Sequence, residues 1–389
     1  MKKNILFVSH DASRTGAPIV FKNFITWVAK NTEFDYTILL KNTDSNRNAL
    51  EIEFITIGPV IKWPSYRGKK TLIGKLGSKI RYKLLKDVPG GLKRQKFDLI
   101  YLNTVDSVDV LPIIRLYQQC PVILHVHEGE YSIKAHYSHA LSAQYTQYIN
   151  KYIVVSESTR DNLIQNFDIP AEKIELVNAF VPVKSLPLAA ILTQTGIQLR
   201  SNSEFVAGGS GTADWRKGID LFIQIATIIK RSGQKVKFVW VGSVEKHVQI
   251  QLDYELKRMG LTSADIIFTG SVPNPHDYFN AFDVFVLTSR EDPFPLVCLE
   301  AASLGKPVIC FADAGGMPEM VNKGGGIVVP YGDTQAMADA IVRLKNNSEL
   351  LIHLGEEAKK IVQQYDIDLQ APRIVDIINQ LTIEVKPHQ

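Results

Sequence analysis

Short runs of apolar residues recur along the chain, and a loop and a segment of helical pattern follow each of them. Residues 5–8, 122–124 and 284–287 are such runs, and residues 219–232 and 296–304 have the composition and length of helices. Parallel strands need long crossover connections, and this alternation supplies them. The pattern therefore predicts doubly wound α/β sheets with helices on both faces.

The strand and helix segments form two series, which separate near residues 181–187. A chain of 389 residues is long enough for two domains, each with its own core. We therefore predict an N-terminal domain over residues 1–183 and a C-terminal domain over residues 184–366, followed by a terminal segment, 367–389.

The segment from Ser289 to Ala301 lies between a predicted strand and a predicted helix. Ligands of open α/β sheets bind at the carboxyl ends of strands, and the start of a helix offers unpaired N–H groups to anions. Asp292 and Glu300 can face one crevice there and hold sugar hydroxyls. The alternative is that Glu300 gains only about 0.3–1 kcal/mol from the helix dipole and that Asp292 lies in a solvated loop.

A second segment, residues 205–218, reads as a strand, a glycine-rich turn and two cations before a helix. Arg216 and Lys217 oppose the helix dipole by roughly 0.3–1 kcal/mol, which indicates that an anion such as a diphosphate binds among them. Ordinary surface charge is the alternative. The turn contains neither a P-loop motif nor the third glycine of a dinucleotide fingerprint, so a Walker ATPase is not indicated.

Polar residues also follow the strands predicted in the N-terminal half. His125 and His127 project to one side of their strand, and Glu128 follows them. This His-x-His-Glu run could suggest a metal, but the two imidazoles have no obvious third ligand, and His125 could be a core histidine. Asn103 follows another strand and could be a plain cap, while Gly16 could serve only a turn.

The segment from Ser289 to Ala301 resembles the donor-binding signature of the retaining GT-B glycosyltransferases of family 4, the group 1 or glycogen-synthase-like type, and is called the donor segment below. The matching features are, in order, a carboxylate, a loop with phenylalanine, Leu296-Val297 and Glu300-Ala301. The family usually has glutamate at both ends, whereas Asp292 follows Glu291 here and Pro295 stands where glycine is commoner. The resemblance implies two Rossmann-like domains facing across a cleft, with the helix in 367–389 crossing back to the N-terminal domain.

The resemblance also implies a role for each matching residue. The donor diphosphate would be bound by Arg216, Lys217, Gly16 and the amides near Leu296 and Val297, and the donor sugar by Asp292, Glu291 and Phe294. The ribose would be bound by Glu300 and the nucleotide base by Val272. The reaction centre would be lined by His127, with Asp292 as the second catalytic residue, and the acceptor side by Glu128 and Asn103.

The implied activity is retaining transfer of a hexose from a nucleotide sugar to a hydroxyl of a glycan or lipid-linked glycan, in polysaccharide or exopolysaccharide biosynthesis. A UDP-hexose is favoured, and UDP-glucose is the first candidate. Neither a metal nor another cofactor is expected, because Arg216 and Lys217 would neutralise the leaving group. The alternatives are a GT-B sugar-nucleotide epimerase and a non-catalytic protein that binds an anionic surface or nucleic acid.

The formal net charge of +4 is unevenly distributed. Residues Lys62 to Lys96 include twelve basic residues and one acidic residue, with apolar residues between them. Such a stretch favours peripheral contact with anionic lipid at about 1 kcal/mol per cation, although a solvated basic helix has the same pattern. Nucleic acid is less favoured, because no recognised binding module accompanies the charge.

The cysteines and the hydropathy of the chain indicate in which cellular compartment the protein is expected. Cys120, Cys298 and Cys310 have no metal-binding spacing and form no disulfide framework. No apolar run approaches the ~20 residues that span a bilayer. We therefore expect a cytoplasmic protein, at the inner face of the cell membrane where the basic stretch makes contact.

Overall fold

The computed structural model describes residues 2–42, 49–63, 89–186 and 204–383. They form two compact units, an N-terminal unit of Met1–Asn178 with Ile367–Gln389, and a C-terminal unit of Ala179–Asp366. The predicted boundary after residue 183 falls slightly later than this division. Residues 179–183 group with the C-terminal unit because the Val181 N–H donates to the Tyr365 carbonyl at 3.2 Å.

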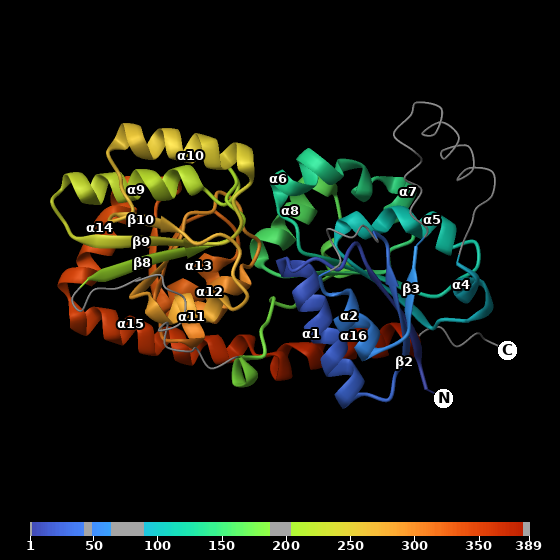
Figure 1. The fold of residues 1–389 in the computed structure, drawn as a ribbon. Helices are drawn as coiled ribbons and strands as arrows, with labels where there is room; N and C mark the ends of the chain where they lie inside the picture. Colours follow the sequence, from blue (N-terminus) through green and yellow to red (C-terminus); the bar gives the residue numbers. More distant parts are fainter. Residues whose placement is uncertain (1, 43–48, 64–88, 187–203, 384–389) are drawn as a thin grey trace, which may run out of the picture. The chain divides into compact units, whose positions relative to one another are not determined.

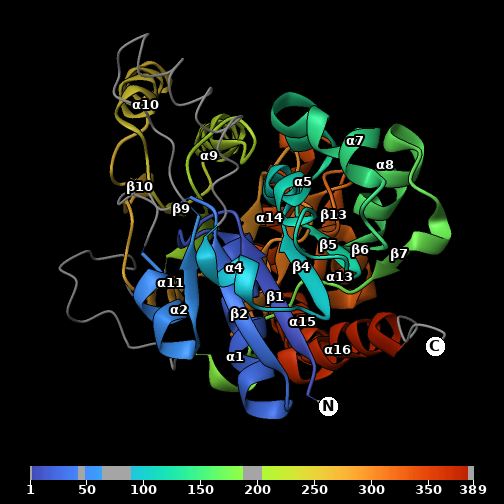
Figure 2. The ribbon, with the colours of Figure 1, turned by 90° about the vertical axis from the view of Figure 1, so that its right-hand side faces the viewer.

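The N-terminal unit is built on a seven-stranded parallel sheet of order β3-β2-β1-β4-β5-β6-β7. Its strands are β1 (Asn4–Ser9), β2 (Asp35–Leu40), β3 (Val60–Lys62), β4 (Leu99–Asn103), β5 (Val122–Val126), β6 (Lys151–Val154) and β7 (Ile174–Leu176). Its helices are α1 (Gly16–Asn31), α2 (Glu51–Ile57), α4 (Gly90–Arg94), α5 (Leu111–Ile114), α6 (Glu130–Ser132), α7 (Ala143–Thr146), α8 (Glu157–Phe167) and α16 (Ile367–Ile383), with a 3-10 turn η2 (Val105–Val110). Figure 2 shows α1 and α16 on one side of this sheet and α7 and α8 on the other.

Burial on both faces explains the apolar runs of this sheet, because helices cover both sides of a parallel sheet. The four residues from Ile5 to Val8 are fully buried. Helix α16 is attached to the same unit through side chains: Lys3 Nζ donates to Asn379 Oδ1 at 2.5 Å, and Trp27 Nε1 donates to Asp368 Oδ1 at 3.0 Å. The last described helix therefore packs with the first part of the chain.

The C-terminal unit has a six-stranded parallel sheet of order β10-β9-β8-β11-β12-β13. Its strands are β8 (Phe205–Ser210), β9 (Val236–Val241), β10 (Ile266–Phe268), β11 (Val284–Leu287), β12 (Val308–Phe311) and β13 (Gly326–Val329). Its helices are α9 (Ile219–Arg231), α10 (Lys246–Met259), α11 (Pro275–Ala281), α12 (Leu296–Ser303), α13 (Met317–Met320), α14 (Thr334–Asn346) and α15 (Ser348–Ile361). In Figure 1, α9 and α10 lie on one side of β8 and β9, and α11 and α12 lie on the other.

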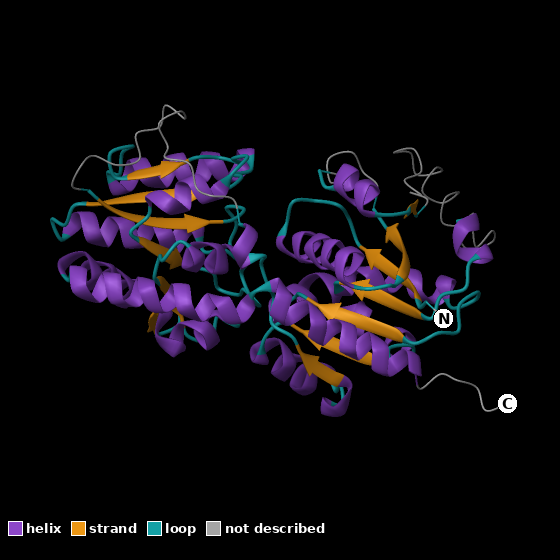
Figure 3. Ribbon diagram, turned by 90° about the horizontal axis from the view of Figure 1, so that it is seen from below, coloured by secondary structure: helices purple, strands orange, loops and turns teal. Residues whose placement is uncertain are grey.

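Both sheets have the doubly wound order that the sequence predicts. The arrows in Figure 3 point the same way within each sheet, as the parallel registers require. In each sheet the chain reverses its direction of growth at the first strand, since β1 lies between β2 and β4, and β8 lies between β9 and β11. Ligands of open α/β sheets bind outside the carboxyl ends of the strands at this switch point.

The predicted basic surface falls largely outside the described residues. The stretch Lys62–Lys96 coincides largely with residues 64–88, which lie outside the described residues, so its contact with lipid stays a prediction. Among the helices that the structure describes, none has the length and apolar character needed to cross a membrane.

Candidate functional site

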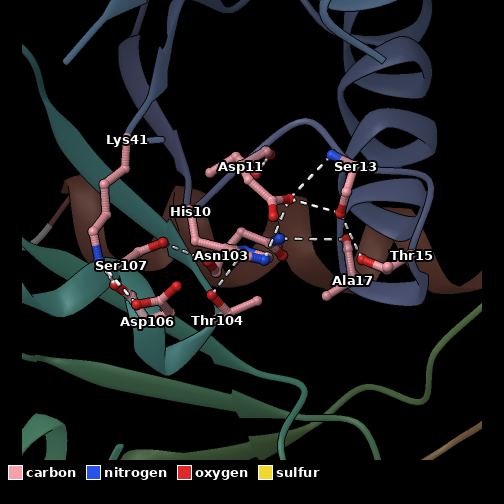
Figure 4. Close-up of polar contacts among 11 residues, drawn as sticks. His10, Asp11, Ser13, Thr15, Ala17, Lys41, Asn103, Thr104, Asp106 and Ser107 are labelled. Atoms are coloured by element: carbon pink, nitrogen blue, oxygen red, sulfur yellow. Dashed lines mark hydrogen bonds and ion pairs between the residues drawn. The ribbon is translucent and has the colours of Figure 1, made fainter. Parts of the chain in front are cut away.

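The carboxyl ends of β1 and β4 place several polar side chains together (Figure 4). Thr104 Oγ1 lies 3.1 Å from His10 Nδ1, and His10 Nε2 lies 3.4 Å from Asp11 Oδ1. Asn103 Nδ2 donates to the Ala17 carbonyl at 3.3 Å, while its Oδ1 is buried without a hydrogen-bond partner among the described residues. Asn103 thus links β4 to the first turn of α1, and its Oδ1 is available to accept a hydrogen bond.

Gly16 is the first residue of α1 and is exposed. A Cβ added at this position would have no atom of the described residues within 4 Å. The protein's own packing therefore does not require a glycine here. The open space fits the predicted approach of a ligand to the backbone, which stays a prediction.

The end of β5 carries the two histidines and Glu128. His125 is buried, and its Nδ1 lies 2.5 Å from the Tyr101 hydroxyl. The His127 ring lies 4.0 Å from the His125 ring, centroid to centroid. Burial, and then the charge of His10, lower the pKa of His127 to about 3, so its imidazole is neutral at pH 7. His125 is therefore the buried histidine of the pair, and His127 is the half-buried one just beyond the end of β5.

Glu128 is anchored by backbone groups. Its Oε2 accepts from the His127 N–H at 3.0 Å and from the Val105 N–H at 3.3 Å. Burial raises the pKa of Glu128 to about 7, even though these two donors act in the opposite direction. Both protonation states of this carboxyl are therefore populated near neutral pH. Within the part of the chain that the structure describes, no group of three or more His, Cys, Asp or Glu residues could hold a metal ion.

In the C-terminal unit, the two predicted cations lie against the predicted sugar carboxylate. Lys217 Nζ donates to Asp292 Oδ2, and Ser289 Oγ donates to the same oxygen at 3.3 Å. Arg216 Nη1 lies 4.0 Å from Asp292 Oδ1 and donates to the Glu291 carbonyl at 3.0 Å. Burial alone would raise the pKa of Asp292, but Lys217 and Arg216 outweigh it and hold this pKa below its usual value. Asp292 is therefore an anion that orients both cations.

The loops after β8 and β11 are joined by a residue that the sequence analysis did not single out. Arg290 donates from Nη1 and Nη2 to Asp220 Oδ1 and Oδ2 at 2.8 and 2.6 Å, and from Nη1 to the Trp215 carbonyl at 2.7 Å. Its guanidinium carbon lies 4.9 Å from the Trp215 ring centroid. Such a two-pronged pair fixes geometry as well as charge. No sequence pattern links Arg290 to Asp220, since their contact depends on the order of strands in the sheet.

Gly218 joins the same two loops through its backbone. Its φ of +69° lies in the left-handed region, and a Cβ there would overlap the Thr288 carbonyl oxygen. The Thr288 hydroxyl donates to the Lys217 carbonyl at 3.0 Å. A glycine is therefore required for the close approach of the loop that carries Lys217.

Two glycines of the predicted phosphate turn have a different role. Gly208 and Gly209 lie within β8, where an added Cβ would overlap the Phe282 ring and crowd the Trp240 ring, respectively. Large aromatic side chains cover both faces of this strand, so only glycine fits beneath them. The glycine-rich turn proper begins at Gly211, whose φ is +142°.

The start of α12 is the predicted place for phosphate and ribose. Leu296 and Val297 are its first two residues, and the first N–H groups of a helix have no partner within the helix. Burial raises the pKa of Glu300, further along the same helix, to about 7. His276 on α11 places its Nε2 3.9 Å from Glu300 Oε2.

Phe294 and Val272, which were predicted to contact the donor sugar and the nucleotide base, are at least half-buried. Phe294 is buried, and its ring centroid lies 5.2 Å from that of Tyr365, so it packs within the C-terminal unit. Val272 lies half-buried in the loop between β10 and α11. Their roles toward the sugar and the base stay predictions, as does the choice between Glu291 and Asp292 as the sugar ligand.

Two family models together match most of the chain. Residues 35–184 match the model described as Glycosyltransferase Family 4, and residues 204–347 match the model described as Glycosyl transferases group 1. The chain belongs to the family 4, group 1 glycosyltransferases. This membership confirms the resemblance seen in the donor segment.

Curated relatives of this family member match part of the chain. The capsular polysaccharide biosynthesis glycosyltransferase CapM of Staphylococcus aureus is 32% identical over 164 residues, which is 42% of each chain. The alpha-galactosylglucosyldiacylglycerol synthase of Streptococcus pneumoniae is 26% identical over 213 residues, or 51% of this chain and 52% of the relative. The chain thus spans about half or less of the length of these relatives.

Solved structures of the GT-B type match nearly the whole chain. HepE of Anabaena, solved with UDP and glucose, superposes with a TM-score of 0.78 at 20% identity, covering 97% of this chain and 100% of HepE. Sucrose-phosphate synthase of Thermosynechococcus elongatus gives a TM-score of 0.77 at 19% identity, covering 98% and 100%. At these identities the likeness establishes the GT-B fold, which agrees with the two parallel sheets.

Proposed function

We propose that this chain is a retaining glycosyltransferase that moves a hexose from a nucleotide sugar to a hydroxyl of a glycan or lipid-linked glycan. The observation that carries this proposal is the cluster of Arg216, Lys217 and Asp292 at the switch point of the C-terminal sheet. Two cations converge there on one buried carboxylate. A bound diphosphate completes this arrangement by meeting the remaining hydrogen-bond donors of both cations.

The diphosphate is the leaving group of the proposed reaction. As the bond between the anomeric carbon and the phosphate oxygen breaks, negative charge accumulates on that oxygen, and Arg216 and Lys217 neutralise it. The first-turn amides of α12 supply further donors for the phosphate. This set of groups performs the task that a divalent cation performs in other phosphate-transferring sites, so the proposed reaction proceeds without a metal or another cofactor.

The proposed donor is a UDP-hexose, with UDP-glucose first. HepE, whose fold this chain shares with a TM-score of 0.78, has been solved with UDP-glucose. Glu300 would accept hydrogen bonds from the ribose, and the loop that contains Val272 would border the base. Asp292 would hold the sugar once a diphosphate has drawn Lys217 toward itself.

The acceptor side of the proposed reaction is the polar edge of the N-terminal sheet. His127 stays neutral at pH 7 and offers a ring nitrogen, while Glu128 and Asn103 offer oxygens to a sugar hydroxyl. Lys41, which is labelled in Figure 4, is paired with Asp106 at 2.9 Å. A neutral hydroxyl fits this edge, and the departing phosphate accepts its proton in a reaction on one face of the sugar, without a covalent nucleophile.

Related proteins support a glycan acceptor. The matches include proteins named for capsular polysaccharide, teichuronic acid and lipopolysaccharide core biosynthesis. We place the reaction in the cytoplasm at the inner face of the membrane, where lipid-linked glycans would meet the stretch Lys62–Lys96. The three cysteines are buried thiols, which agrees with a reducing compartment.

The test is a donor screen with the purified protein. Individual nucleotide sugars are incubated with and without a glycan acceptor, and free nucleotide and glycosylated product are measured. Arg216→Ala and Lys217→Ala should weaken nucleotide binding, whereas His127→Ala should mainly reduce turnover. An isomerised sugar nucleotide would support an epimerase instead, and inactivity with every common donor would favour a non-catalytic binder.

A further inference from the structure

Glu300 on α12, the residue proposed to bind the ribose, has a side-chain carboxylate that accepts no hydrogen bond from the described residues. The Glu300 side chain is 16% exposed, and no donor among the described residues reaches its oxygens. His276 Nε2 lies 3.9 Å from Glu300 Oε2, which is too long for a hydrogen bond. His276 is itself 7% exposed, and its Nε2 has no hydrogen-bond partner among the described residues.

The other nitrogen of His276 determines what Nε2 can do. Asn274 Nδ2 donates to Asp277 Oδ1 at 2.8 Å, which turns Asn274 Oδ1 toward His276 Nδ1 at 3.2 Å. An amide oxygen only accepts, so Nδ1 carries the ring proton and donates it to Asn274. In the neutral imidazole, Nε2 is then a bare acceptor. Burial also lowers the pKa of His276, which keeps the ring neutral at pH 7.

When Glu300 is ionised, as it mostly is above pH 7, its carboxylate and His276 Nε2 are two acceptors that lie side by side without a donor between them. Leaving such buried groups unsatisfied costs about 1–3 kcal/mol each, so a site of this kind favours a ligand with two adjacent donors. The two neighbouring hydroxyls of a ribose have this chemistry. Both residues lie in one unit, on helices α11 and α12, which pack against each other.

We propose that His276 reads the ribose of the donor nucleotide: its Nε2 accepts a hydrogen bond from one of the 2′- and 3′-hydroxyls while Glu300 accepts from the other. His276 is in this way a specificity-determining residue that selects ribonucleotides over deoxyribonucleotides. The inference rests on the proposed function, since it assumes that a nucleoside diphosphate binds at α12. It goes beyond the proposed function by giving a ribose-binding role to His276, a residue that lies outside the family signature.

The test is calorimetric binding of UDP, 2′-deoxy-UDP and 3′-deoxy-UDP to the full chain. His276→Phe keeps a ring in the pocket and removes the acceptor, and His247→Phe, at an exposed position of α10, is the matched control. We expect wild type to bind UDP about tenfold more tightly than each analogue, the effect of one hydrogen bond. His276→Phe should bind UDP about tenfold more weakly than wild type and should no longer distinguish UDP from one of the two analogues.

Two further variants separate hydrogen bonding from packing. His276→Gln restores an acceptor and should recover part of the lost discrimination, and Asn274→Ala frees the tautomer and should weaken discrimination while the imidazole stays in place. Unchanged discrimination in folded His276→Phe would overturn the inference and leave the proposed function standing. Failure of wild type to bind UDP, ADP or GDP at all would overturn both.

Discussion

The replacement Glu300→Gln should stabilise the nucleotide-free protein above pH 7 while weakening its function. Burial raises the pKa of Glu300 from 4.5 to about 7. The folded state therefore holds this proton more tightly than the unfolded state does, and wild-type stability falls as the pH rises from about 4.5 through about 7. One pKa unit corresponds to about 1.4 kcal/mol, so the ionised carboxylate lowers the free energy of unfolding by about 3 kcal/mol at pH 8.

The assay is equilibrium unfolding in urea between pH 4 and pH 8, followed by circular dichroism. Below about pH 4.5 the carboxyl is neutral in both states, so any difference between Glu300→Gln and wild type there reflects the amide itself. That difference should grow in favour of the variant by about 3 kcal/mol toward pH 8, with most of the increase between pH 4.5 and 7. Glu356→Gln, at an exposed position of α15, should show no such growth.

The same variant should bind UDP more weakly than wild type at pH 8, because an amide has one acceptor oxygen where a carboxylate has two. A buried ionised carboxylate that lowers stability but binds the ligand is one form of the trade-off between stability and function. A stability difference that stays constant from pH 4 to pH 8 would refute the reasoning, since the buried ionised carboxylate would then carry no energetic penalty.

Three other predictions concern the remaining parts of the site. Gly218→Ala should lower the melting temperature more than Gly233→Ala, because both have positive φ, worth roughly 1–2 kcal/mol, but only the former would overlap another backbone segment; differential scanning fluorimetry of both variants checks this. Lys217→Ala should lose roughly 3–5 kcal/mol in urea unfolding, because it removes the closest charged partner of the buried Asp292; adding Asp292→Asn should restore much of this stability, and a binding titration should show that it does not restore UDP affinity. Turnover should rise as the pH passes through about 7, where Glu128 ionises, and a pH profile of Glu128→Gln should lack this rise.

Much of the donor side could be predicted from local pattern. The apolar run 284–287 coincides with β11, and the predicted helix start at 296 coincides with that of α12. The strand-to-loop junctions then locate Lys217 and Asp292 at the carboxyl ends of two parallel strands. The carboxyl ends of parallel strands meet at one edge of a sheet, so the pattern places both residues at that edge, whereas their contact depends on β8 and β11 being neighbours.

Other parts of the site depend on the order of the strands. Arg290 pairs with Asp220, and His276 lies beside Glu300, although neither pair has a spacing that a single element would bring together. Their contacts arise because β8 and β11 are neighbours in the sheet and because α11 packs on α12. The sequence alone offered no signal for either pairing.

The sequence by itself determined the alternation of strands and helices, the two sheets and the side of each sheet where ligands bind, because these follow from hydrophobic periodicity and from the geometry of parallel strands. Only the tertiary structure decided that Gly208 and Gly209 make room for aromatic rings, that His125 faces the core while His127 lies at the edge, and which charges are paired. The reason is physical: periodicity reports which face of an element is buried, whereas burial, pKa and pairing depend on neighbours that are distant in the chain.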